Sequence, residues 1–259
     1  MIKTLIRSDL HPEQIINTLK TLDLTTEVKH LAALLHQKTA DDPELSRGAA
    51  ILSSTNIHTG TLTLYYNASG NISLKAPDNA PVSPQLYTVP GNSILFAINA
   101  QSYRVQLYEV ADDYLILGPQ VTVDADNPLL IDGTKVLFDS NPTGNGHPAF
   151  IGSLNFPDKS ADIRVFERRS LRKCAWFPHD KSAAHYLVSL ELLEAVQDPD
   201  SSKVAEELIY HYHPAVAWKA FQLIYGADPC NARRYVPQLR KLQNTHLNRL
   251  LDQHLDEVA

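Results

Sequence analysis

The sequence predicts an α+β fold, with a central antiparallel β-domain of sandwich or jelly-roll type between N-terminal helices and a C-terminal α-helical domain. Two observations predict it. From residue 59 to residue 165, short segments with a period of two alternate with turn residues. Before and after that region, apolar residues recur with the period of a helix. We therefore expect a helical segment over residues 1–57, a β-domain over residues 58–178 and a helical domain over residues 179–259.

The first part carries the start signals of three helices. The first is expected to begin near Pro12, with Asp9 as a candidate N-cap. A second is expected after Thr25 or Thr26, and a third, shorter one at the Asp-Pro-Glu sequence of residues 42–44. The apolar faces of the first two helices comprise Ile15, Ile16, Leu19 and Leu22, followed by Val28, Leu31, Ala32, Leu34 and Leu35.

The middle part begins with a hairpin signal. Apolar and polar residues alternate over residues 61–66, turn residues occupy 67–71, and an answering apolar segment follows. The Pro-rich residues 76–92 are expected to form a long loop or an edge segment. Further strand candidates recur about every ten residues, which favours a sandwich, a jelly roll or a small barrel. They are residues 93–99, 103–110, 114–123, 129–131, 135–140, 149–156 and 162–167.

The helical pattern resumes after Asp180. Ser182 opens a segment that is expected to form a helix as far as about Val196, because leucines recur there at helical spacing. A second helix is expected over residues 201–211 and a third after Pro214. The last 25 residues, which carry eight further apolar positions at similar spacing, predict one or two amphipathic helices.

One segment of this C-terminal part resembles the HEAT class of helical repeats. The resemblance lies in the sequence His213-Pro214-Ala215-Val216, followed by Trp218-Lys219-Ala220 and Leu223. The arginine that such repeats usually carry after the valine is absent. The match covers about 50 residues, or one and a half repeats, whereas an independent solenoid needs roughly three. The resemblance implies stacked helix pairs that present a binding surface, and a helical bundle packed on the β-domain is the alternative.

The strand count and spacing of the middle part resemble the cupin class of jelly-roll barrels. Metal-binding cupins carry a His-x-His sequence, a nearby glutamate and a further histidine, but between residues 59 and 166 this chain has only His147. The resemblance therefore extends to shape alone. A metal-dependent enzyme, an oxygenase or an isomerase, is the alternative function that it implies. The candidate ligands for its single transition metal, iron or zinc, would be His147, His179 and His185.

No motif in the sequence assigns a catalytic residue. It contains no phosphate-binding glycine pattern, no GxSxG nucleophile elbow and no HExxH metal motif. His211 and His213 flank Tyr212, and we expect them to interact with the carbonyl groups of a helix C-terminus rather than with a metal. Cys174 and Cys230 exclude a cysteine-based zinc site of the usual spacing, and we expect both to be small buried residues.

The overall charge argues against nucleic acids and anionic membranes as partners. The formal net charge is −6, whereas nucleic acids and anionic lipids attract basic proteins. No apolar run approaches the roughly 18 residues that span a bilayer. The first residues lack the apolar region and cleavage site of a secretory signal peptide, so the cytoplasm is the expected location.

Two local basic groups stand out against this acidic background. One contains Arg168, Arg169 and Arg172, and the other contains Arg233 and Arg234. Because arginine binds anionic groups well, we take these five residues as candidate contacts for a partner protein. For the first group, the alternative is a strand edge that is protected by charge and by internal ion pairs.

These observations favour a cytoplasmic binding, adaptor or regulatory protein, with no cofactor predicted. Its helical tail, or the groove between that tail and the β-domain, would hold another protein. Besides the metal-dependent enzyme, a second alternative is a small-molecule sensor that holds its ligand between Tyr65, Phe96, Tyr103 and Phe138. At this spacing the same aromatic residues also suit a packed core. The sequence leaves the oligomeric state open.

Overall fold

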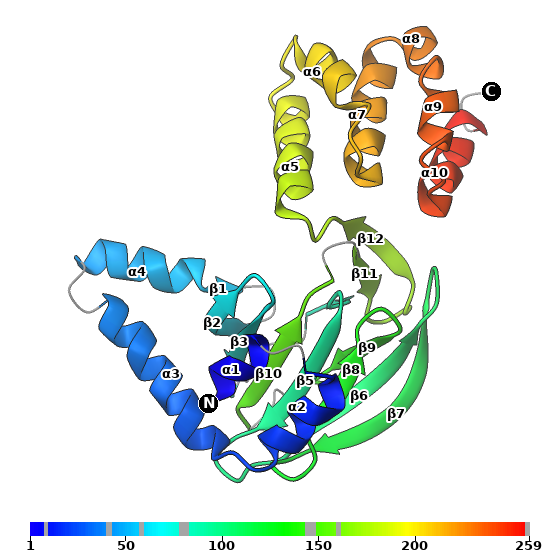
Figure 1. The fold of residues 1–259 in the computed structure, drawn as a ribbon. Helices are drawn as coiled ribbons and strands as arrows, with labels where there is room; N and C mark the ends of the chain where they lie inside the picture. Colours follow the sequence, from blue (N-terminus) through cyan, green and yellow to red (C-terminus); the bar gives the residue numbers. More distant parts are fainter. Residues whose placement is uncertain are drawn as a thin grey trace. The chain divides into compact units, whose positions relative to one another are not determined.

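The computed structural model describes residues 1–7, 10–39, 43–56, 60–77, 83–142, 149–158 and 162–256. These residues form an α+β fold, with helices before and after a central antiparallel β region (Figure 1), as the sequence predicted. The chain divides into two compact units, Met1–Ala175 and Trp176–Ala259. The N-terminal helices therefore belong to the same unit as the strands.

Four helices open the first unit, and local capping sets where they begin. Pro12 is the first residue of α2, and the backbone N–H of His11 donates to Gln14 Oε1 at 3.0 Å. Asp23 caps α3, because its Oδ1 accepts from the backbone N–H of Thr26 at 3.1 Å. The predicted cap, Thr25 or Thr26, is therefore wrong by two or three residues. The other candidate, Asp9, lies outside the described residues. The helices are α1 (Ile2–Arg7), α2 (Pro12–Leu19), α3 (Leu24–Thr39) and α4 (Glu44–Ser53).

Three of these helices, α1, α2 and α3, pack against one face of a six-stranded antiparallel sheet. Its order is β1-β2-β3-β10-β5-β8, and Ile72, Ile94 and Leu154 of its central strands share a core with Ile6 of α1 and Leu19 of α2. The predicted hairpin forms β2 and β3. The strands are β1 (Thr55–Asn56), β2 (Thr61–Asn67), β3 (Gly70–Lys75), β5 (Asn92–Ala97), β8 (Leu129–Asp132) and β10 (Ile151–Phe156).

Two three-stranded sheets complete the first unit, in the orders β7-β6-β9 and β12-β11-β4. Leu95 and Ala97 of β5 pack against Val105 of β6 and Val123 of β7, so β5 is buried on both of its faces. The short β4 is an edge strand in the Pro-rich segment. The strands are β4 (Gln85–Tyr87), β6 (Tyr103–Val110), β7 (Leu115–Val123), β9 (Val136–Asp139), β11 (Ile163–Glu167) and β12 (Lys173–Phe177).

The aromatic residues considered for a ligand cavity belong to the packed interior of the first unit. Phe96 and Tyr103 are 0% and 4% exposed, and the Tyr103 hydroxyl donates to the carbonyl oxygen of Phe96 at 3.2 Å. Burial raises the pKa of Tyr103. Tyr65 and Phe138 pack against two neighbouring clusters of buried residues. The Phe96 ring also fills the space above Gly152, where a Cβ atom would lie 2.2 Å from it.

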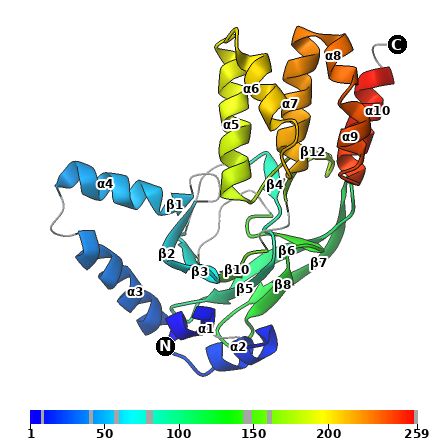
Figure 2. The same ribbon diagram turned by 45° about the horizontal axis from the view of Figure 1, so that its top comes forward.

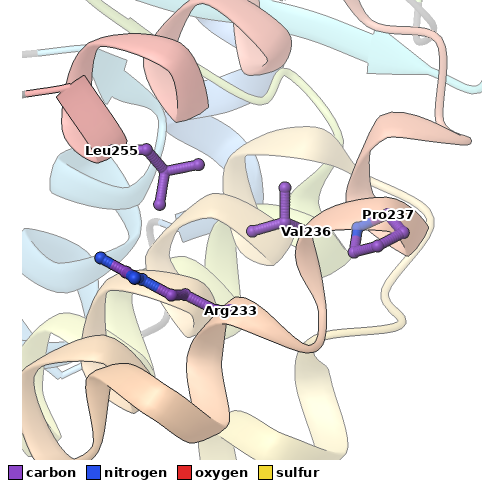
Figure 3. A pocket seen from close by; sticks show the side chains of 4 residues that line it. All are labelled: Arg233, Val236, Pro237 and Leu255. Atoms are coloured by element: carbon purple, nitrogen blue, oxygen red, sulfur yellow. The ribbon is translucent and has the colours of Figure 1, made fainter. Parts of the chain in front are cut away.

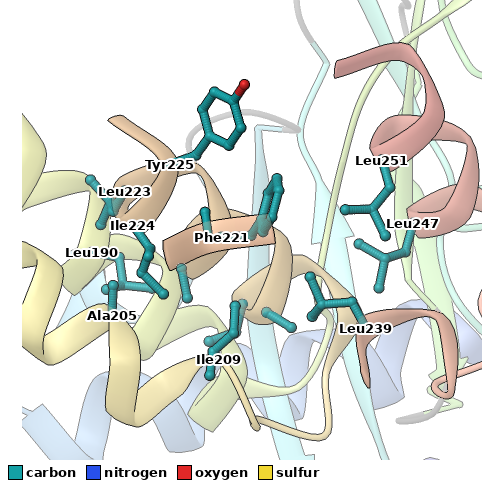
Figure 4. Close-up of a cluster of buried hydrophobic side chains, with 14 of the residues drawn as sticks. Leu190, Ala205, Ile209, Phe221, Leu223, Ile224, Tyr225, Leu239, Leu247 and Leu251 are labelled. Atoms are coloured by element: carbon teal, nitrogen blue, oxygen red, sulfur yellow. The ribbon is translucent and has the colours of Figure 1, made fainter. Parts of the chain in front are cut away.

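The second unit is helical, and α7 forms its centre. Figure 2 shows α7 between α5–α6 and α9–α10. Val216, Ala220 and Phe221 of α7 are fully buried, and leucines of α9 and α10 pack with Phe221 (Figure 4). The helices are α5 (Lys181–Ala195), α6 (Ser201–Leu208), α7 (Pro214–Ala227), α8 (Pro229–Arg233), α9 (Val236–Arg240) and α10 (Thr245–Asp256).

The predicted start of this helical region is confirmed. The Asp180 carboxylate accepts from the backbone N–H of Ala183 at 2.8 Å and so caps α5. The second helix, α6, ends at Leu208, three residues before its predicted end. The residues that follow form the connection to Pro214, which opens α7. Within the described part of the chain, no helix combines the length and the apolar character that crossing a membrane requires.

Candidate functional site

A group of aromatic side chains lies exposed at one end of the helical unit. Tyr186 belongs to α5, while Tyr210, His211 and Tyr212 lie in the connection from α6 to α7. The ring centroids of Tyr186 and His211 are 5.2 Å apart, and those of His211 and Tyr212 are 4.4 Å apart. The three tyrosines are 43%, 60% and 63% exposed in sequence order. We call these four residues the tyrosine–histidine surface.

Asp180 fixes the position of Tyr212. The Tyr212 hydroxyl donates to Asp180 Oδ1 at 2.9 Å, while the same carboxylate caps α5. The hydrogen bonds from the Ala183 N–H and then from Tyr212 lower the pKa of Asp180. The bond to this carboxylate raises the pKa of Tyr212. The tyrosine ring is therefore held in place although most of it faces solvent.

His211 and His213 accept hydrogen bonds from the backbone. The N–H of His213 donates to His211 Nδ1 at 3.0 Å, and the N–H of Ala215 donates to His213 Nδ1 at 3.2 Å. In the neutral rings, the proton therefore lies on Nε2, so neither nitrogen offers a free lone pair to a metal. The prediction of a helix C-terminus is wrong for His213, which is the N-cap of α7. His211 does follow the end of α6, and its backbone N–H donates to the carbonyl oxygen of Leu208 at 2.9 Å.

Acidification is expected to destabilise the helical unit through His211. Burial, and then the neighbouring His213, lower the pKa of His211. The unfolded chain, with a histidine pKa of about 6.5, therefore binds this proton at a higher pH than the folded chain does. The contribution of neutral His211 to the stability of the fold is fully present above the unfolded pKa of about 6.5. It is lost as the pH falls through the lower pKa of the folded chain.

Urea unfolding at about pH 7.5 and about pH 5.5 measures this effect. In a Trp176→Phe background, the fluorescence of Trp218, which lies on α7, reports on the helical unit alone. His211→Asn keeps an acceptor near the position of Nδ1 but cannot titrate, so its unfolding free energy should fall less on acidification. An equal fall in the variant and the natural protein would contradict the role of His211.

Trp176 extends the ring contacts from the tyrosine–histidine surface. Its ring stacks on His213 with a centroid distance of 6.1 Å and meets the edge of His246 at 4.9 Å. Sequence reasoning missed this tryptophan and all three tyrosines of the surface. The sequence feature that could have indicated them is the run of tyrosine and histidine residues over 210–213, directly before the proline that opens α7.

Arg168 holds the first unit together instead of lying free on its surface. Its guanidinium donates to the carboxylate of Asp139 and to the backbone oxygen of Ser83 at 2.8 Å. The Arg168 and Asp139 side chains are 24% and 4% exposed. This arrangement is the internal ion pair that was the alternative to partner binding. Arg169 and Arg172, at the turn between β11 and β12, are exposed.

The second basic group lies on the surface of the helical unit. Arg233 and Arg234 at the end of α8 are both exposed, and Arg234 also donates to Asn231 Oδ1. The next residue, Tyr235, has its ring centroid 6.1 Å from that of Tyr210. The basic group therefore adjoins the tyrosine–histidine surface. Arg233 also lines a hollow of about 440 Å³ together with Val236, Pro237 and Leu255. Figure 3 shows these four side chains.

The structure places two of the three candidate metal ligands. His179 is partly buried just before α5, and His185 is exposed on α5, while His147 lies outside the described residues. Among the residues that the structure describes, no three or more His, Cys, Asp or Glu side chains gather as a metal site would require. The iron or zinc site stays a prediction.

Both cysteines are exposed, so the prediction that they are buried is wrong. Cys174 lies on β12, which is an edge strand of its sheet. Cys230 lies in the first turn of the short helix α8, on its solvent side. Free cysteine is usually buried, but each of these two residues lies on a peripheral element whose outer side faces solvent.

Comparison with known proteins adds little to this geometry. No protein-family model matches the chain, and neither does any curated protein. The solved structure of a hydroquinone 1,2-dioxygenase, PnpCD, in complex with Cd²⁺ and 4-hydroxybenzonitrile aligns with 42% of this chain and 71% of its own. The identity is 8% and the TM-score 0.29, which is too low to say anything about the fold or function of this chain.

Proposed function

We propose that the chain is a cytoplasmic protein-binding protein, an adaptor or a regulator, and that its helical unit holds another protein. The observation that carries the proposal is the exposure of Tyr210 and Tyr212, at 60% and 63%, in rings that are fixed by neighbouring groups. Tyrosine is enriched among the residues that dominate the binding energy of protein interfaces.

The fixed position of the rings supports this function. Tyr212 is held by Asp180 and by His211, and Tyr210 lies against Tyr235. Side chains that are ordered before binding lose little conformational entropy when the partner arrives. Binding through these rings therefore gains contact area at a small entropic penalty.

The surroundings of the surface fit a partner with acidic groups. Arg233 and Arg234 adjoin it, and arginine is also over-represented in interfaces. The exposed thiols of Cys174 and Cys230 fit the reducing cytoplasm. Arg169 and Arg172, which are exposed in the other unit, are proposed as separate contacts for a partner protein. A HEAT-like stacking of α5–α6 and α7–α8 is consistent with a binding surface, and the predicted groove between the two units stays a prediction.

Replacing Tyr210 and Tyr212 by alanine tests the proposal. The tagged protein is purified from its own host, and the proteins bound to it are quantified by mass spectrometry. We expect the double variant to lose its main partner at least about tenfold, since one hot-spot residue contributes roughly 1.4 kcal/mol or more. Tryptophan fluorescence should show an unchanged fold.

Matched controls come from the other unit. Tyr66 and Tyr114 are 68% and 53% exposed on strands or beside them, so their replacement by alanine removes similar exposed rings. These two variants should retain the partner in full. Recovery of the same partner in the same amount with the Tyr210 and Tyr212 variant would refute the role of this surface.

A further inference from the structure

Three groups of the tyrosine–histidine surface can donate hydrogen bonds to a partner. The Nδ1 of His211 accepts from the backbone N–H of His213 at 3.0 Å, so the neutral ring carries its proton on Nε2. Within the described part of the chain, neither this Nε2–H nor the hydroxyl groups of Tyr186 and Tyr210 donate a hydrogen bond. Tyr212 differs, because its hydroxyl already donates to a carboxylate. A partner that covers the surface must bring acceptors, since a buried donor without one weakens binding.

Two carboxylates near the rings are already hydrogen-bonded. Asp180 accepts from the Tyr212 hydroxyl and from a backbone N–H group. Glu206, whose charge acts on Tyr235, accepts from Asn231 Nδ2 at 2.5 Å. These oxygens are therefore less available to N–H groups of a partner. A partner with many free carbonyl groups and few N–H groups suits such a surface.

A proline-rich segment in the polyproline II conformation has this chemistry. Proline has no backbone N–H, and the polyproline II helix has no internal hydrogen bonds, so its carbonyl groups are free to accept. The carbonyl groups of a partner helix or of a paired strand are already used by its own backbone. Proline-rich segments also dock on exposed aromatic side chains, and their preformed conformation keeps the entropic penalty of binding small.

The spacing of the rings fits such a segment. Tyr186, His211 and Tyr212 form one group of rings, and Tyr210 with Tyr235 forms another. Tyr210 and Tyr212 are separated by a single residue, so their Cα atoms lie within about 7.6 Å of each other. A polyproline II segment of about six residues is roughly 19 Å long. It is therefore long enough to contact both groups.

The charges around the rings favour acidic residues at one end of the ligand. Arg233 and Arg234, next to Tyr235, are exposed, and Arg233 forms no ion pair with any residue that the structure describes. On α6, the exposed Glu207 lies one helical turn before Tyr210. The arginines attract an acidic group of a ligand, whereas this glutamate repels one. The ligand therefore fits best with its acidic residues at the arginines and its uncharged part on the rings.

We propose that the tyrosine–histidine surface binds a proline-rich segment in the polyproline II conformation, with acidic residues at one end that meet Arg233 and Arg234. The proposal rests on the proposed function, because it names the chemistry of the partner. The proline rings lie on the tyrosine rings. The carbonyl groups accept from Tyr186, Tyr210 and His211.

Fluorescence anisotropy with labelled peptides and the full chain tests the proposal. The probes are eight prolines with an Asp-Glu pair either before or after them, because a polyproline II segment can lie in either direction. We expect one of the two to bind with a dissociation constant on the order of 50 µM, since the interface is small. A peptide that carries the same charges on glycine and serine should bind at least about tenfold more weakly, because it has to be ordered first.

Tyr210→Phe isolates the role of the donor, since it keeps the ring and removes only the hydroxyl. It should weaken binding of the proline peptide about fivefold, which corresponds to one hydrogen bond. Tyr114→Phe is the matched control, because Tyr114 is 53% exposed in the other unit; its affinity for the peptide should not change. An unchanged affinity in Tyr210→Phe would overturn the proposal.

A charge exchange tests the arginine end. Replacing Arg233 and Arg234 by glutamate should weaken binding of the acidic peptide about tenfold, and a peptide with a Lys-Lys pair in its place should restore it. Affinities that ignore both exchanges would contradict the acidic end. Equal binding of the glycine–serine peptide, or no binding of either proline peptide up to about 500 µM, would overturn the proposal as a whole. The proposed function would survive that result if the Tyr210 and Tyr212 double variant still lost its natural partner.

Discussion

Replacing Asp139 by alanine is expected to lower the unfolding free energy of the first unit by about 3 kcal/mol. The Asp139 side chain is only 4% exposed, and it accepts hydrogen bonds from the guanidinium of Arg168 and from the backbone N–H of Asn141, the latter at 3.0 Å. Its removal leaves a mostly buried guanidinium without its counter-charge. A buried charge that loses its partner destabilises a fold far more than the loss of an exposed ion pair.

Urea unfolding followed by two signals isolates this effect. Circular dichroism reports on both units, whereas Trp218, the tryptophan that remains in a Trp176→Phe background, lies on α7 of the second unit. Only the circular dichroism transition of the first unit should therefore move. Asp132→Ala is the control, because Asp132 is 39% exposed and pairs with Lys135, which is 78% exposed. It should lower the unfolding free energy by at most about 1 kcal/mol. Equal losses in the two variants would show that Asp139 is not a buried partner of Arg168.

The same ion pair shows where sequence reasoning stops. The sequence placed Arg168 in a basic group and offered both a surface role and an internal ion pair. Asp139 lies 29 residues away, and only the pairing of β-strands brings the two side chains together. A charge run has the same appearance in the sequence whether a carboxylate faces it or not. Arg169, the next residue, is exposed.

Local elements could be predicted because their signals are local. The hairpin of β2 and β3 follows from alternation and from a turn in which Asn67 Oδ1 accepts from the backbone N–H groups of Ser69 and Gly70. Helix α5 begins where Asp180 can cap it. The turn of the hairpin and the start of α5 each depend on residues within a few positions of one another. Turn propensity and helix capping therefore suffice to predict them.

The candidate site could not be assembled in this way. Tyr212 is held by Asp180, which lies 32 residues earlier. Tyr186 of α5 contacts His211 of the connection between α6 and α7. The sequence drew attention to His211 and His213 because histidine is a frequent metal ligand. It could not show that backbone N–H groups occupy their Nδ1 atoms. The adjacent tyrosines carried no motif, and their exposure is a property of the packed unit.

Phe221→Ala is expected to lower the unfolding free energy of the helical unit by about 3–5 kcal/mol. Phe221 is fully buried at the centre of α7. Its ring centroid lies 5.7 Å from that of Trp218, 5.8 Å from that of Tyr225 and 6.0 Å from that of His254. Truncation removes the ring that joins α7 to α10 and leaves a cavity that the surrounding helices can fill only in part.

The tryptophan transition should therefore move to lower urea while the circular dichroism transition of the first unit stays in place. Phe221→Leu, which keeps most of the volume, should lose much less stability. Phe166→Ala provides the reciprocal control, because Phe166 is equally buried but lies in the first unit; it should move only the other transition. If Phe221→Ala shifted both transitions together, the two units would unfold as one, since a cavity in one core affects the other core only when their unfolding is coupled.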